Sequence, residues 1–90
     1  IGLYVAPAPL GDDLGLGLGD EGEAVVSLQR ALARFGYGIE LTGTYGKGLE
    51  QVVQAFQLHF RPARIDGRAD ASTQDTLDRL IAALEARPVA

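Results

Sequence analysis

Apolar residues recur at spacings of three and four in three separate stretches of the chain. The first stripe consists of Val25, Leu28, Leu32 and Phe35. This period is typical of an amphipathic helix and predicts one over about residues 21–35. Asp20 and Glu23 have the D-x-x-E spacing of a helix N-terminus. Gly36 follows at the position where a left-handed C-terminal cap is expected.

The second and third stretches have the same period. The second stripe consists of Leu49, Val52, Val53, Phe56 and Phe60. The third consists of Leu77, Leu80, Ile81 and Leu84. They predict helices over about residues 49–60 and 73–85. Pro62 ends the second of these helices, and Ser72 with Asp75 suits a capping box for the third.

Two of these predicted helices are preceded by the same sequence pattern. The stretch "TGTYGKGLEQVVQAFQ" (42–57) and the stretch "DGRADASTQDTLDRLI" (66–81) each place a glycine turn ahead of a helix, and Gly43 aligns with Gly67. Because helices this short are marginal alone, they must bury their stripes together. The sequence therefore predicts an all-α fold, a small three-helix bundle with two pseudo-repeated halves.

The ends of the chain have a different composition. The opening "IGLYVAPAPLGDDLGLGLGD" contains an Ala-Pro repeat and a run of glycines, which indicates an irregular lead-in or interdomain linker. We therefore expect a lead-in over residues 1–19, the helical domain over 20–86 and a tail over 87–90. Since the chain begins at Ile1 and contains no methionine, we expect a processed product or a fragment of a longer protein.

Charge and composition exclude several classes of function. The net charge of the 90 residues is −4, Lys47 is the only lysine, and the seven arginines are scattered. Nucleic-acid binding requires a basic face, so it is not expected. No apolar run reaches the ~20 residues of a membrane-spanning helix. The chain has no cysteine, hence no disulfide framework and no thiolate metal site.

The motifs that resemble catalytic or cofactor sites are incomplete. "GLGDEG" (17–22) has dinucleotide spacing, but its acidic residues would repel a pyrophosphate. "GKG" (46–48) lacks the first glycine and the hydroxyl residue of a phosphate loop. "DGRADAS" (66–72) lacks the distal glutamate of a calcium loop. His59, the only histidine, has no obvious set of further ligands. We therefore expect no catalytic site and no cofactor in this chain.

All three tyrosines fall outside the helical stripes, and two of them lie between the predicted helices. Tyr37 and Tyr45 lie in glycine-containing turns. Tyrosines at such positions stack on sugars or peptides, with the hydroxyl free to hydrogen-bond. Equally, each ring closes an end of the bundle. The sequence leaves both interpretations open.

Three segments together resemble the type-1 peptidoglycan-binding domain family. They are "EGEAVVSLQRALARFGY" (21–37), "TGTYGKGLEQVVQAFQ" (42–57) and "IDGRADASTQDTLDRL" (65–80). The chain departs from the family pattern at three positions, with Thr42 in place of Asp, Leu49 in place of Thr and Asp70 in place of Gly. The run "FQLHFRPARIDGRADAST" (56–73) also looks like the module appended to zinc-dependent N-acetylmuramoyl-L-alanine amidases.

The resemblance implies a function and its partners. It implies a non-catalytic module of the cell envelope, periplasmic or extracellular, that binds peptidoglycan and is covalently linked to a catalytic domain. Any zinc would belong to that upstream domain. The alternative is a structural or protein-interaction domain on the same fold that does not bind the wall.

The expected binding residues follow from the chemistry of a muropeptide, which carries amides, hydroxyls and carboxylates. Tyrosine rings would stack, basic side chains would bind carboxylates, and a glutamine would bind amides. The six candidates are Tyr37, Tyr45, Lys47, Gln57, Arg61 and Arg64. Gln29 and Gln57 can equally bind backbone groups within the domain, because each follows a core residue.

Overall fold

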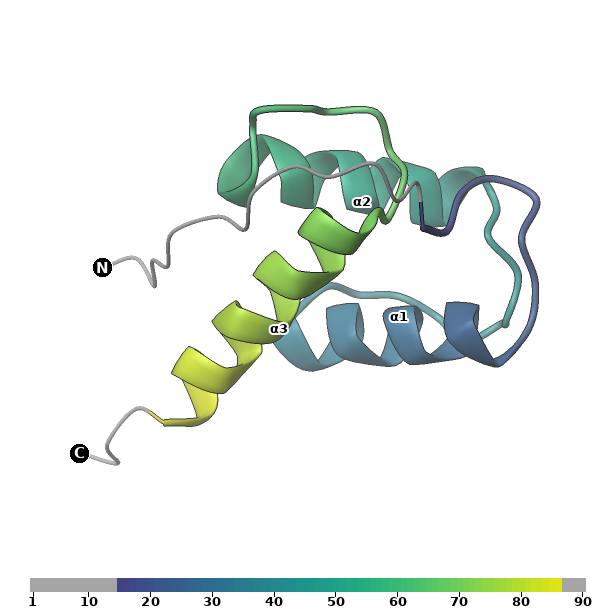
Figure 1. Cartoon of the computed structure of the whole chain (residues 1–90). Helices are drawn as coiled ribbons and strands as arrows, with labels where there is room; N and C mark the ends of the chain where they lie inside the picture. Colours follow the sequence, from purple (N-terminus) through teal and green to yellow (C-terminus); the bar gives the residue numbers. More distant parts are fainter. Residues whose placement is uncertain (1–14, 87–90) are drawn as a thin grey trace.

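The computed structural model describes residues 15–86, which form three helices. These are α1 (Glu23–Phe35), α2 (Lys47–Phe60) and α3 (Ala71–Glu85). Figure 1 shows α1 and α2 running in roughly the same direction, with α3 crossing obliquely. Over the described range there are only two isolated antiparallel bridges and no strand. The predicted all-α, three-helix architecture is confirmed. Most of the predicted lead-in, residues 1–14, and the tail lie outside the described residues.

The core is built from the three predicted stripes. Its buried stripe residues are Val25, Leu28, Leu32, Leu49, Val53, Phe56, Leu77 and Leu80. Four further stripe residues, Phe35, Val52, Phe60 and Ile81, are partly buried and pack against this core. At one end Phe35 meets Phe56 edge-on at a ring-centroid distance of 6.1 Å and Phe60 at 5.3 Å. Edge-to-face packing of this kind stabilises an aromatic cluster beyond the area it buries.

The helix N-termini differ from the predicted ones. The N-cap of α1 is Gly22, with no side-chain hydrogen bond, whereas Asp20 was expected there. The carboxylate of Asp20 instead accepts a hydrogen bond from Gly17 N at 2.8 Å, and its carbonyl accepts one from Tyr45 N at 2.8 Å. Asp20 is therefore occupied in stabilising the turn before α1. At the other end, Gly36 has φ 124° and confirms the predicted cap.

The other two helices begin two residues earlier than predicted. In α3 the N-cap is Asp70, whose carboxylate accepts a hydrogen bond from Thr73 N at 2.7 Å. Ser72, the predicted cap, is buried inside the first turn. Asp70 takes the N-cap position because its carboxylate, three residues before Thr73, accepts a hydrogen bond from an N–H of the first turn that has no partner within the helix.

In the structure, the two predicted repeats each contain a glycine turn that is hydrogen-bonded to a glutamine side chain. Gly43 and Gly67 have φ values of 78° and 75°, a region open to glycine. The N–H of Gly43 donates to Gln29 Oε1 at 2.9 Å, and the N–H of Gly67 donates to Gln57 Oε1 at 2.9 Å. In both halves, a glutamine from the preceding helix therefore holds the glycine turn that leads to the next helix.

Candidate functional site

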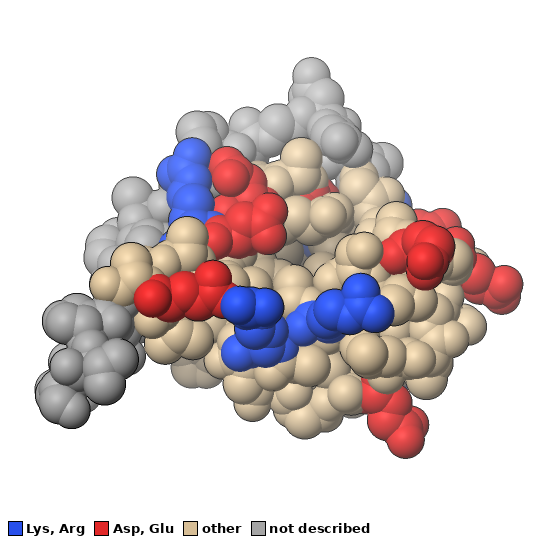
Figure 2. Space-filling model, turned by 90° about the horizontal axis from the view of Figure 1, so that it is seen from below, with Lys and Arg blue, Asp and Glu red and all other residues tan. Residues whose placement is uncertain are grey.

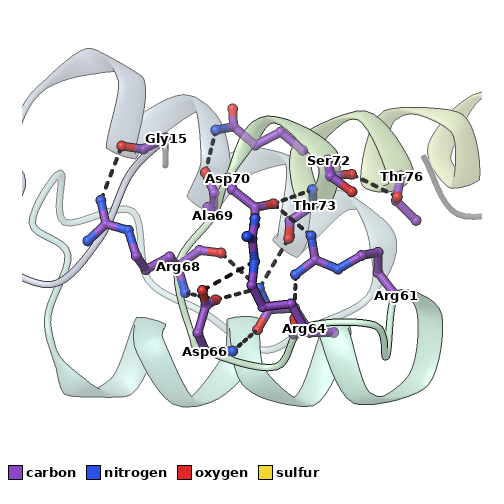
Figure 3. A network of polar contacts seen from close by, with 12 residues as sticks. Gly15, Arg61, Arg64, Asp66, Arg68, Ala69, Asp70, Ser72, Thr73 and Thr76 are labelled. Atoms are coloured by element: carbon purple, nitrogen blue, oxygen red, sulfur yellow. Dashed lines mark hydrogen bonds and ion pairs between the residues drawn. The ribbon is translucent and has the colours of Figure 1, made fainter. Parts of the chain in front are cut away.

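Three of the six predicted binding residues lie in a polar network at the start of α3 (Figure 3). Arg61 Nη1 is 2.8 Å from Asp70 Oδ1, and Arg64 Nη2 is 2.8 Å from Asp70 Oδ2. The side chains of Arg61 and Asp70 are both only 1% exposed. Arg61 is therefore already neutralised inside the domain. Its charge is directed at Asp70, so the binding of a ligand carboxylate by Arg61 stays a prediction that would require this buried pair to open.

Arg64 occupies the outer edge of the same network. Its side chain is 35% exposed and lies 3.7 Å from a carboxylate oxygen of Asp66, measured from Nε. Its guanidinium is thus shared between two carboxylates of its own chain. Only part of its surface is left for a carboxylate of the wall.

The network controls the ionisation of Asp70. Burial opposes ionisation of this carboxyl, but hydrogen bonds from Arg64, Thr73 and Arg61 outweigh burial and lower its pKa to about 2. The ordinary value is 3.8. Because the pKa is lower in the folded state, ionised Asp70 stabilises the fold above the unfolded pKa, and this stabilisation is lost as the pH falls toward 2.

We therefore expect acid to destabilise the domain over a low pH range. Between pH 5 and pH 2 the free energy of unfolding should fall by about 2 kcal/mol through Asp70 alone. Urea unfolding followed by circular dichroism at pH 5, 4, 3 and 2 measures this. A loss already complete at pH 4 would contradict it, because a carboxyl with a pKa near 2 is still ionised there.

Gln57 is also committed to the inside of the domain. It is 0% exposed. Its Oε1 accepts hydrogen bonds from Asp66 N at 3.0 Å and Gly67 N at 2.9 Å, and its Nε2 donates to Arg68 O at 2.8 Å and Thr73 Oγ1 at 3.1 Å. Of the two interpretations of this glutamine, the structure supports the internal one. Gln29 has the corresponding internal role in the first half.

The structure separates the two tyrosines. Tyr45 is 1% exposed, and its hydroxyl donates to Gly67 O at 2.5 Å. Burial raises the pKa of this hydroxyl. The ring of Tyr45 therefore closes the bundle, and its stacking on a ligand stays a prediction that would require the ring to leave the core. Tyr37 is only half-buried and reaches the surface.

Tyr37 borders a hollow of about 420 Å³. The other lining residues are Phe35, Gly36, Ala55, His59 and Phe60. The rings of Phe35 and Tyr37 are 6.3 Å apart, and burial raises the pKa of the Tyr37 hydroxyl. This hollow offers aromatic surface with one phenolic hydroxyl at its edge. We refer to it as the aromatic hollow.

A second hollow, of about 350 Å³, lies between the α1–α2 connection and the first half of α2. Its polar residues are Gln29, Glu40, Thr42 and Thr44, and its apolar ones are Ile39, Leu49 and Val52. Gly38, Gly46 and Gly48 complete the lining. We refer to it as the glycine hollow. The sequence signal for it was the row of glycines around Lys47, which matched no known motif.

Lys47 is exposed at the first residue of α2, between two glycines of that lining. The six predicted residues therefore do not form one site. Tyr37 and Lys47 lie at the surface near the two hollows, Arg64 is partly exposed, and the other three are buried. What the sequence missed is the pair of hollows themselves, because they are formed by residues that are mostly small or apolar.

Surface charge, metal-binding side chains and helix length each bear on the kinds of ligand and location that the domain can have. On the face shown in Figure 2, basic and acidic side chains are interspersed, with acidic groups at more places than basic ones and no continuous basic patch. Within residues 15–86, no three His, Cys, Asp or Glu side chains lie close enough together to hold a metal ion. None of the three helices is long and apolar enough to cross a membrane.

Comparison with known proteins defines the class. A family model described as "Putative peptidoglycan binding domain" matches residues 21–77, and the chain belongs to this family. Membership identifies it as a binding domain of the cell envelope or extracellular space.

One curated relative is more particular. Over 55 residues the chain is 42% identical to the N-acetylmuramoyl-L-alanine amidase AmiD of Escherichia coli strain K12. The match covers 61% of this chain and 20% of the amidase, so the chain spans about a fifth of that relative. No solved structure matches the chain significantly.

Proposed function

We propose that this chain is a non-catalytic peptidoglycan-binding module that holds an attached wall hydrolase, an N-acetylmuramoyl-L-alanine amidase, at its substrate. The observation that carries the proposal is the family match over residues 21–77 combined with 42% identity to one segment of an amidase. Catalysis, with any zinc, would belong to the part of such an enzyme that the match does not cover. The module would act in the periplasm or outside the cell.

The mechanism is an increase in local concentration. A module that binds the wall weakly converts the next encounter of the linked enzyme with the polymer into an intramolecular event. The module need not touch the scissile bond. It needs only a surface suited to a repeating ligand rich in hydroxyl, amide and carboxylate groups, and the two surface hollows provide aromatic, hydroxyl and backbone groups of that kind.

Retention on purified sacculi tests wall binding. The isolated chain should sediment with peptidoglycan sacculi and remain soluble with cellulose, a glycan polymer that lacks peptides and N-acetyl groups. Deleting the module from the amidase that carries it should slow hydrolysis of sacculi roughly tenfold or more. Hydrolysis of a small soluble muropeptide should be unchanged. No retention of the chain on sacculi would contradict wall binding, and equal loss on both substrates would contradict targeting.

A second candidate function has some support from the surface. Leu58 is 60% exposed on α2, and Ile65 is 45% exposed in the connection that follows. A domain that packs against a protein partner would use such side chains. The sacculus experiment separates the two functions, because a protein-interaction domain would stay in the supernatant.

A further inference from the structure

Both hollows lie between the same two segments of the chain, which are α2 and the connection that precedes it. On α2, Gly48 and Val52 line the glycine hollow, while Ala55 and His59 line the aromatic hollow. Spacings of four, three and four residues place these four positions on one face of the helix. The opposite wall is the continuous segment 35–44, whose first three residues line one hollow and whose later residues line the other. The hollows therefore lie one after the other along the same two segments, over about 16 Å from the helical rise over eleven residues, and we refer to the two together as the groove.

One half of the groove is an aromatic surface. Phe60 lies 5.3 Å from Phe35 and 6.1 Å from His59, both measured between ring centroids. Tyr37 adds a hydroxyl at the rim. Such a surface can cover the apolar C–H face of a sugar ring while the hydroxyl binds one of its polar substituents.

The other half has three glycines that the fold does not require. Gly38, Gly46 and Gly48 all lie outside the positive-φ region, and a Cβ added to any of them would meet no heavy atom within 4 Å. Gly43, by contrast, needs glycine for its φ of 78°. Gly48 even lies within the first turn of α2, where alanine would be more stable by up to about 1 kcal/mol. Side chains at these three positions would instead fill the hollow, so the glycines keep it open.

The same half also presents unused backbone groups. Within the described part of the chain, the N–H and C=O groups of residues 38–41 have no hydrogen-bond partner. Extended peptides bind to such exposed backbone by adding main-chain hydrogen bonds, as a strand adds to the edge of a sheet. Glycine next to these groups lets a ligand backbone approach closely. This half is therefore suited to a peptide rather than to a sugar.

We propose that a muropeptide lies along this groove, with its sugar against the aromatic hollow and its stem peptide along residues 38–41. The inference rests on the proposed wall binding and names the parts of the polymer that are recognised. It also assigns a function to Gly38, Gly46 and Gly48, namely to leave room for the peptide.

Amide NMR spectra of the ¹⁵N-labelled chain test this arrangement with three probes. The probes are the GlcNAc–MurNAc disaccharide, the free stem peptide, and the disaccharide-peptide. The disaccharide should shift amides around Tyr37 and His59, the peptide should shift those of residues 38–41 and 46–48, and the third probe should shift both sets. Shifts confined to other surfaces, or the two probes in exchanged halves, would overturn the proposal.

The variant Gly48→Gln separates a binding role from a structural one. It places a long side chain in the glycine hollow while favouring the helix, so thermal stability should be equal or higher. Peptide affinity should fall roughly tenfold, equivalent to 1.4 kcal/mol, with the disaccharide shifts unchanged. Gln51→Ala, at an exposed α2 position that lines neither hollow, is the matched control.

Sacculus sedimentation and peptide binding together distinguish the groove assignment from the proposed wall binding. If the wild-type chain sediments with sacculi but Gly48→Gln binds the peptide equally well, the groove is wrong and wall binding stands. If the wild-type chain does not sediment with sacculi, wall binding itself fails, and the groove assignment fails with it.

Discussion

Replacing Asp70 with asparagine should lower the free energy of unfolding by about 3–5 kcal/mol, the usual cost of leaving one partner of a buried ion pair without the other. Asparagine keeps the shape of the side chain, but it removes the charge and replaces one of the two acceptor oxygens with a donor NH2 group. Arg61, whose side chain is 1% exposed, would then remain buried without a counter-ion. The cap on Thr73 N would also weaken, because a neutral amide oxygen is a poorer acceptor than a carboxylate.

Urea unfolding at pH 7 measures this, with Asp75→Asn as the control. Asp75 lies on the same helix and pairs with Arg79 at 3.2 Å, but its side chain is 52% exposed. Exposed pairs of this kind contribute less than about 1 kcal/mol. If Asp70→Asn and Asp75→Asn destabilise the domain equally, the buried pair is not the main support of the start of α3.

The second large effect is expected at Gln57. Gln57→Ala should cost about 3 kcal/mol, because it leaves the N–H groups of Gly67 and Asp66 without the acceptor that holds them, at about 1–3 kcal/mol each. The turn between α2 and α3 would then lose the side chain that holds it. Thermal unfolding followed by circular dichroism measures the loss.

Gln29 provides a matched comparison within the same chain. It has the equivalent position in the first half, but its partners are Gly43 N and the hydroxyl of Thr42, an exposed residue. Water can replace part of these bonds, so Gln29→Ala should cost about 1 kcal/mol. Equal losses from the two substitutions would show that the halves are energetically equivalent and would contradict the difference in burial as the cause.

The fold could be predicted from the sequence because the patterns that indicate it each lie within a short segment of the chain. Each apolar stripe is a repeat within one helix, and each glycine turn is a short motif. The predictions for Gly36 and for the paired Gly43 and Gly67 depended on backbone conformations that few residues other than glycine adopt. The helix N-termini were less certain, because several side chains near each start could act as caps.

The binding residues were harder to predict because their positions depend on distant contacts. Arginine and tyrosine are usually exposed at least in part, yet Arg61 and Tyr45 are almost completely buried. Their partners, Asp70 and Gly67, lie 9 and 22 residues further along the chain. No spacing rule links such pairs. The groove was missed for a related reason, since its walls meet only when the α1–α2 connection lies against α2.

One short contact at the edge of the domain has a mechanical consequence. Leu16 and Ala69 form an antiparallel bridge with hydrogen bonds of 3.0 and 2.8 Å, although they are 53 residues apart. Ala69 is followed directly by Asp70. A pull on the chain ahead of residue 15 would therefore load these two hydrogen bonds first, next to the buried pair of Asp70 and Arg61. We expect α1, which begins seven residues after Leu16, to be loaded only after this bridge has opened.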